Sequence, residues 1–154
     1  ATLLEHSENA PDSGNLLDLG CGWGPIALTL AAARPEATVW AVDVNERALE
    51  LTRMNAEKLG LSNVRTALPA EVPDDIRFSG IWSNPPIRVG KQALHEILDQ
   101  WLPKLEVGCD AYLVVSKDLG ADTLLKWLQT NFENLASERI DTAKGFRILR
   151  CERL

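Results

Sequence analysis

The 154-residue sequence is poor in cysteine, histidine and basic side chains, and each shortage argues against a class of protein. Its three cysteines, Cys21, Cys109 and Cys151, form no Cys-x-x-Cys pair and no cluster with the two histidines. This spacing fits neither a disulfide framework nor a zinc site. We therefore predict a protein without a bound metal that resides in a reducing compartment, the cytoplasm.

Long hydrophobic runs are also missing. No segment approaches the roughly 18 apolar residues that cross a membrane, and no charged start followed by an apolar run marks a signal peptide. The formal net charge is −6, whereas free-standing nucleic-acid-binding proteins usually carry a basic field. Binding of nucleic acid would therefore require a local basic patch or a second domain. Because the chain begins at Ala1 instead of Met, we expect a processed product or part of a longer protein.

The sequence does contain a regular alternation of strand and helix patterns. Its length and its 45% hydrophobic content predict a single domain over residues 1–154. The predicted strands are 15–19, 38–42, 64–67, 78–83, 111–116, 135–140 and 146–151. The predicted helices are 25–33, 46–59, 90–101 and one from Gly120 or Asp122 to about Asn131. Residues 1–13 are expected to form a short helix and a loop, and 69–77 a polar connection.

This alternation predicts an α/β fold with a Rossmann-like, mostly parallel seven-stranded sheet and helices on both faces. The link 141–145 between the last two strands is short. Since parallel neighbours need a long crossover, the short link predicts a C-terminal antiparallel strand.

The chain is organised around a glycine-rich turn, D-L-G-C-G-W-G, which follows the first strand at Asp18 and precedes the first helix. Gly20, Gly22 and Gly24 would let a ligand approach the backbone at a helix N-terminus. Asp43 ends the second strand, where a carboxylate can bind both hydroxyls of a ribose. The dinucleotide fingerprint needs its third glycine one residue later, and Asp18 would repel a pyrophosphate. These features favour S-adenosylmethionine, which carries positive amino and sulfonium groups, over a nicotinamide cofactor.

A second motif, Asn84-Pro85-Pro86-Ile87, follows the fourth strand, beside the switch point where open α/β sheets bind ligands. Its prolines fix the backbone and thereby the direction of the Asn84 amide and the Pro85 carbonyl. These two acceptors can hold both hydrogens of a planar amino group. They would orient its nitrogen for attack on a methyl group and favour the positive charge that develops on it.

Together, the segments D-L-G-C-G-W-G, A-V-D-V-N and S-N-P-P-I resemble class I S-adenosylmethionine-dependent methyltransferases that act on amines. Residues 84–91, 115–121 and 144–149 resemble, more narrowly, the small-subunit ribosomal RNA guanine-N2 methyltransferases of the RsmC type. The resemblance covers about residues 14–154. It implies methyl transfer to guanine N2 of 16S ribosomal RNA, with S-adenosylhomocysteine as the product. It also implies sequence upstream of Ala1, so residues 1–13 are expected to be truncated relative to the family.

The resemblance further implies roles for individual residues. The implied cofactor-binding residues are Asp18, Gly20, Cys21, Gly22, Asp43, Val44, Ala67, Leu68 and Asn84. Asp18, Gly20 and Gly22 would line the methionine end, Asp43 would bind the ribose, and Val44 would pack on the adenine. Many relatives carry an acidic residue after the third strand that meets the adenine amino group. No acid occurs here before Glu71, so backbone carbonyls are expected to serve instead.

The implied catalytic residues are Asn84, Pro85, Pro86 and Ile87. Asn84 and Pro85 would hold the target amine and Ile87 would contact the base. Ile87 lacks the aromatic ring with which DNA adenine relatives stack on a flipped base, and this favours guanine N2. A basic rim that contacts RNA phosphates is expected to comprise Arg88, Lys91, Lys117, Lys144 and Arg147.

Other interpretations remain open from the sequence alone. The same acceptor pair would serve a protein glutamine amide or another RNA base. A second alternative is a cofactor-binding or ribosome-interacting domain without catalysis, against which both intact motifs argue, and a dehydrogenase is a more distant alternative. We expect His95 to be a structural histidine and Cys21, between glycines, to be a small packing residue, because no base lies near it in sequence.

Overall fold

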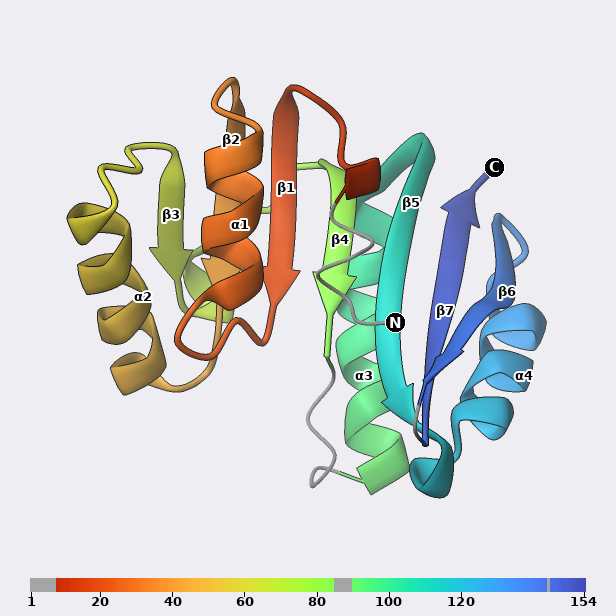
Figure 1. The fold of residues 1–154 in the computed structure, drawn as a ribbon. Coiled ribbons are helices and arrows are strands. Elements are labelled where there is room, and N and C mark those ends of the chain that lie inside the picture. Colours follow the sequence, from red (N-terminus) through yellow and green to blue (C-terminus); the bar gives the residue numbers. More distant parts are fainter. Residues whose placement is uncertain (1–7, 85–89, 144) are drawn as a thin grey trace.

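The fold is a seven-stranded sheet with the order β3-β2-β1-β4-β5-β7-β6 (Figure 1). The computed structural model describes residues 8–84, 90–143 and 145–154. Its strands are β1 (Gly14–Leu19), β2 (Ala37–Val42), β3 (Val64–Ala67), β4 (Phe78–Ser83), β5 (Leu105–Ser116), β6 (Leu135–Ala143) and β7 (Phe146–Arg153). Its helices are α1 (Pro25–Ala33), α2 (Glu46–Lys58), α3 (Gly90–Trp101) and α4 (Ala121–Asn131), with short 3₁₀ turns η2 (Pro69–Glu71), η4 (Leu102–Lys104) and η5 (Lys117–Leu119).

Strand directions confirm the predicted fold class. β1 pairs in parallel with β2 and β4, β2 with β3, and β4 with β5. β7 is antiparallel to both of its neighbours, β5 and β6. The carboxyl ends of the five parallel strands therefore meet at one edge of the sheet, which lies at the bottom of Figure 1.

Two hydrophobic layers fix this arrangement. Alternate residues of a strand point to opposite faces, and in β1 the fully buried Leu16 and Leu17 belong to different core clusters. Leu16 packs with residues of α1 and α2, while Leu17 packs with residues of α3 and α4. In Figure 1, α1 lies in front of the sheet and α3 lies behind it. On the α3 side, His95 stacks on Trp127 of α4, with ring centroids 3.8 Å apart.

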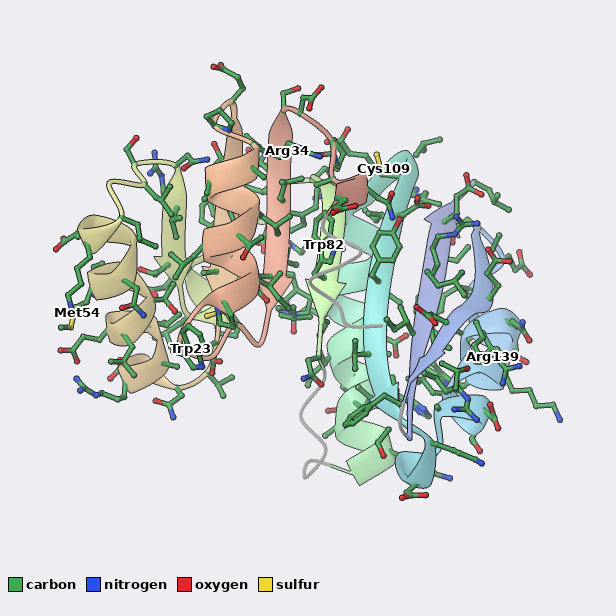
Figure 2. All side chains as sticks on the ribbon, in the orientation of Figure 1. Trp23, Arg34, Met54, Trp82, Cys109 and Arg139 are labelled. Atoms are coloured by element: carbon green, nitrogen blue, oxygen red, sulfur yellow. The ribbon has the colours of Figure 1, made fainter. Side chains whose placement is uncertain are left out.

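Local signals in the sequence account for most of the element boundaries. Pro25 occupies the first turn of α1, where its missing N–H costs nothing. Asn45 caps α2 by accepting hydrogen bonds from the backbone N–H groups of Arg47 and Ala48. Arg34, at the end of α1, donates to the carbonyl of Ala10 at 3.0 Å and so ties down the segment before β1 (Figure 2).

Two predicted boundaries differ from the structure by three residues or more. β5 begins at Leu105, whereas the strand was expected at 111, after Gly108. Gly108 has a φ of +82° inside the strand, and the register between β4 and β5 shifts between Phe78 and Gly80. The glycine therefore belongs to an irregularity within a longer strand and does not precede it. β6 continues to Ala143, so the turn before β7 is shorter than the predicted link 141–145.

Within the part of the chain that the structure describes, no helix is long and apolar enough to cross a membrane. As predicted, residues 69–77 form no full helix, and the short η2 is the one element between β3 and β4.

Candidate functional site

The glycine turn between β1 and α1 is held by hydrogen bonds from its own backbone. The N–H groups of Gly20 and Cys21 donate to the carbonyl of Val42 at 2.7 and 3.1 Å, and Gly24 N–H donates to the carbonyl of Cys21 at 3.0 Å. Gly20, Gly22 and Gly24 have φ values of +79°, +58° and +100°, which favour glycine. The motif is therefore required by the shape of the turn itself.

Helix α2 supplies two further contacts to this turn, which sequence reasoning missed. Thr52 is fully buried, and its hydroxyl donates to the carbonyl of Gly22 at 2.9 Å. One turn later, Asn55 donates to the carbonyl of Trp23 at 3.2 Å. The Trp23 side chain itself is 59% exposed and lies at the surface near α2 (Figure 2). Two successive carbonyls of the turn are thus fixed by side chains from a distant segment.

Asp18 lies beneath the turn with 2% of its surface exposed. Its Oδ2 accepts a hydrogen bond from the backbone N–H of Ala27, in the first turn of α1, at 3.0 Å. The residue at the N-cap, Gly24, has no side chain for this task, so Asp18 supplies the missing acceptor. Burial raises the pKa of Asp18 to about 7, against a lowering by the Ala27 hydrogen bond.

Cys21 behaves as the packing residue that the sequence predicts. It is 5% exposed, with its Sγ 3.8 Å from the hydroxyl of Thr52. Burial and, secondarily, the charge of Asp18 raise its thiol pKa to about 12. A thiol with that pKa is not a nucleophile at neutral pH.

Asp43 follows β2 and faces the turn. Its Oδ2 accepts from the N–H of Gly22 at 3.0 Å, and its Oδ1 accepts from the N–H of Asn45 at 2.9 Å. These bonds fix the orientation of the carboxylate. Each oxygen has a second lone pair that can accept from a ligand hydroxyl.

A cleft of about 420 Å³ opens at the carboxyl ends of β1, β2 and β4, on the α3 side of the sheet. This volume lies within the usual range for small-molecule sites. The described residues that line it are Leu19, Gly20, Val42, Asp43, Val44, Pro69, Ser83, Asn84, Ile97, Gln100 and Trp101. Hollows also border the sheet at β3 and at β6, away from the glycine turn.

Asn84 brings the second motif to the first. It is exposed and lines the cleft, and its backbone carbonyl oxygen lies 3.7 Å from the position that a Cβ on Gly20 would occupy. The hydroxyl of Ser83 donates to the carbonyl of Leu19 at 3.0 Å, which joins the ends of β4 and β1. Pro85, Pro86 and Ile87 lie outside the described residues.

The structure brings together some of the predicted cofactor residues at the cleft and adds others. Gly20, Asp43, Val44 and Asn84 line it. Asp18, Cys21, Gly22, Ala67 and Leu68 are not among its described lining residues. After β3, Pro69 contributes to the wall, while Leu68 N–H donates to the carboxylate of Glu71 at 2.8 Å.

Helix α3 forms the other wall of the cleft through Ile97, Gln100 and Trp101, which sequence reasoning did not assign to the site. Trp101 belongs to the hydrophobic core on this side of the sheet, and Ile97 packs against it. The signal that was available is their spacing with Gln100, because i, i+3 and i+4 residues share one helical face.

The predicted basic residues are only partly described. Arg88 and Lys144 lie outside the described residues. Lys91 in the first turn of α3 and Lys117 after β5 are exposed, and Arg147 at the start of β7 is half-buried. All three lie at the edge of the sheet where the parallel strands end. That they form a continuous rim stays a prediction.

Comparison with known proteins is consistent with this geometry. Residues 1–150 match the profile of a family described as "Methyltransferase small domain". The uncharacterized protein YbxB of Bacillus subtilis is 34% identical over 155 residues, which cover 99% of this chain and 76% of YbxB. Ribosomal RNA small subunit methyltransferase C of Pseudomonas entomophila is 31% identical over 163 residues, which cover 99% of this chain and 46% of that protein.

Among solved structures, the Thermus thermophilus 16S rRNA N2 G1207 methyltransferase (RsmC), in complex with AdoMet and guanosine, has a TM-score of 0.81. It is 23% identical, and the match covers 99% of this chain and 42% of that one. This likeness shows the fold. By length, this chain spans about three quarters of YbxB and less than half of each of the two ribosomal RNA methyltransferases.

Proposed function

Because this chain belongs to the methyltransferase small domain family, we propose that it methylates the exocyclic N2 of a guanine in small-subunit ribosomal RNA. Its cofactor is S-adenosylmethionine. The RNA target is our inference from the resemblance to RsmC-type enzymes, of which the chain covers less than half.

The cleft fits this cofactor. Nothing among the described residues lies within 4 Å of a Cβ position on Gly22, so the turn presents an open backbone surface. Gly20 and Gly22 would support the methionine end, and the negative charge of Asp18 beneath them would favour its positive groups. The carboxylate of Asp43 would accept the ribose hydroxyls, and Val44 would pack on the adenine. When bound, S-adenosylmethionine supplies a methyl carbon that its sulfonium sulfur makes electrophilic.

The observation that carries the proposal is the position of Asn84 at the cleft, beside Gly20. The side chain amide of Asn84, together with the Pro85 carbonyl, would accept hydrogen bonds from the target amine. These bonds direct the nitrogen lone pair toward the methyl carbon. As the new C–N bond forms, the C–S bond breaks and its electron pair stays on sulfur. The methylated amine then releases a proton to solvent, so no covalent enzyme intermediate is needed.

Ribosomal RNA would reach this site along the edge where the parallel strands end. Lys91, Lys117 and Arg147 lie on that side, and with Arg88 and Lys144 they would form the phosphate-binding rim. Because the chain as a whole carries a net charge of −6, affinity for RNA would depend on these few residues and would fall with salt.

The test is methyl transfer from radiolabelled S-adenosylmethionine to 16S ribosomal RNA and to assembled small subunits, with mass mapping of the modified nucleotide. We expect N2-methylguanosine with the wild type. Asn84→Ala should lose at least about two orders of magnitude in rate while it still binds S-adenosylhomocysteine. Asn131→Ala, at the far end of α4, is the matched control and should retain activity. Unchanged activity of Asn84→Ala would remove this residue from the mechanism.

The competing interpretations give different results in the same experiment. Label on a different base, or on a glutamine amide when proteins are supplied, would support methyltransferase activity but contradict guanine N2 as the target. Cofactor binding without methyl transfer to any of these acceptors would favour the alternative of a cofactor-binding domain that does not catalyse a reaction.

A further inference from the structure

We propose that Gln100 on α3 recognises the adenine base of the cofactor, in a role that the segment after β3 does not fill. The proposal rests on S-adenosylmethionine as the cofactor, and it is independent of the RNA target. Adenine presents an amino donor next to ring-nitrogen acceptors, so a site that selects it needs one acceptor and one donor side by side.

Several hydrogen-bonding groups at the end of β3 already have partners. Leu68 N–H donates to the Glu71 carboxylate at 2.8 Å, and the carbonyl of Leu68 accepts from Glu71 N–H at 2.9 Å. The carbonyl of Ala67 accepts from Asp43 N–H at 3.3 Å. Pro69 lines the cleft but has no N–H to donate. The end of β3 thus contributes an apolar ring to the cleft, and its single nearby carboxylate caps η2.

The polar side chains in the cleft wall differ in the hydrogen bonds that they already form. The carboxylate of Asp43 is fixed by two backbone N–H groups, and the hydroxyl of Ser83 donates to Leu19. Asn84 lies next to Gly20, where the target amine is proposed to bind. The amide of Gln100 forms no hydrogen bond within residues 8–84, 90–143 and 145–154, and it is the remaining group that carries both an acceptor and a donor.

The surroundings of Gln100 suit a flat heterocycle. Ile97 and Trp101 flank it on the same face of α3, and Val44 and Pro69 contribute apolar surface from the ends of β2 and β3. Such a lining accommodates the faces of a ring, while a single amide satisfies its polar edge. A glutamine amide pairs with the amino group and an adjacent ring nitrogen of adenine through two hydrogen bonds.

The test is a double-mutant cycle between the side chain and the base. Calorimetry would measure the Kd of wild type and Gln100→Leu for S-adenosylhomocysteine and for its analogue without the 6-amino group. Because Gln100 is exposed, the variant should fold, and thermal unfolding would check this. Gln92→Leu, an exposed glutamine on the same helix, is the matched control.

For wild type and Gln92→Leu, we expect loss of the amino group to weaken binding about fivefold to tenfold. Gln100→Leu should bind S-adenosylhomocysteine more weakly than the wild type by about the same factor. It should also bind S-adenosylhomocysteine and the analogue with equal affinity. If Gln100→Leu discriminates between them as the wild type does, the proposal is overturned. A wild type that binds neither ligand would overturn both this inference and the proposed function. Binding that depends on Gln100 without methylation of RNA would overturn the RNA target alone.

Discussion

Replacement of Asp18 by asparagine should make the protein more stable at neutral and alkaline pH. The Asp18 carboxylate is 2% exposed, and burial raises its pKa from the ordinary value of 3.8 to about 7. Between these two values the folded state keeps a proton that the unfolded state has released. The free energy of unfolding therefore falls as pH rises through this window and levels off above about pH 7.

The magnitude follows from the shift of about three pH units. At about 1.4 kcal/mol per unit, the ionised form of Asp18 lowers the free energy of unfolding by about 4 kcal/mol at alkaline pH. We treat this as an upper bound, because local relaxation and water entry reduce the cost of a buried charge. An asparagine oxygen can still accept the hydrogen bond from Ala27 and carries no charge. Asp18→Asn should therefore lack this loss of stability.

Urea unfolding followed by tryptophan fluorescence, from about pH 5.5 to about pH 8.5, would measure the effect. This range stays above the isoelectric point near 4.9 and still contains about 2 kcal/mol of the expected change. The stability of Asp18→Asn relative to wild type should grow as pH rises to about 7. Asp75→Asn, at an exposed position, should follow the wild type. A constant difference between Asp18→Asn and wild type over this range would refute the reasoning.

Three further predictions concern the turn, the ribose site and the thiols. Thr52→Val should lower the free energy of unfolding by about 1–3 kcal/mol and weaken S-adenosylhomocysteine binding in calorimetry, because it removes the hydroxyl that donates to the Gly22 carbonyl. Thr52→Ser should restore most of the affinity, and equal affinities for both variants would contradict a positioning role. Asp43→Ala should weaken the same binding by at least about tenfold, and an unchanged Kd would remove it from the ribose site. In timed alkylation with mass-spectrometric readout, the half-buried Cys109 should react before the buried Cys21 and Cys151, and faster labelling of Cys21 would contradict its burial and its pKa of about 12.

The fold was largely predictable because its signals are local. Pro25 and Asn45 mark the starts of α1 and α2 without reference to distant residues. The helix 25–33 and the strands 64–67 and 78–83 have their predicted bounds. The start of β5 was not predictable, because Gly108 carries the same signal for a turn as for an irregularity inside a strand. Only its pairing with β4 distinguishes the two, and that pairing is a tertiary contact.

The candidate site was predictable in part for the same reason. Gly20, Asp43 and Asn84 each follow a strand, and parallel topology brings strand ends together without further information. Gln100 and Thr52 lie within helices, where their distance from any strand end says nothing about the site. Their contribution depends on how α3 and α2 rotate and slide against the sheet. The core packing of the whole molecule decides this, and the spacing of Ile97, Gln100 and Trp101 shows only that they share one helical face.

Asp18 shows how stability and function are related in this turn. An asparagine at this position would accept the Ala27 hydrogen bond equally well and avoid the burial of a charge, so helix capping alone does not account for the carboxylate. In the proposed site, a negative charge beneath Gly20 and Gly22 would attract a ligand with an amino and a sulfonium group, and such a ligand would in turn favour ionised Asp18. Binding would then recover part of the free energy that the empty fold loses above about pH 7. By this linkage, affinity for the cationic cofactor should rise with pH through the same window in which the empty protein loses stability.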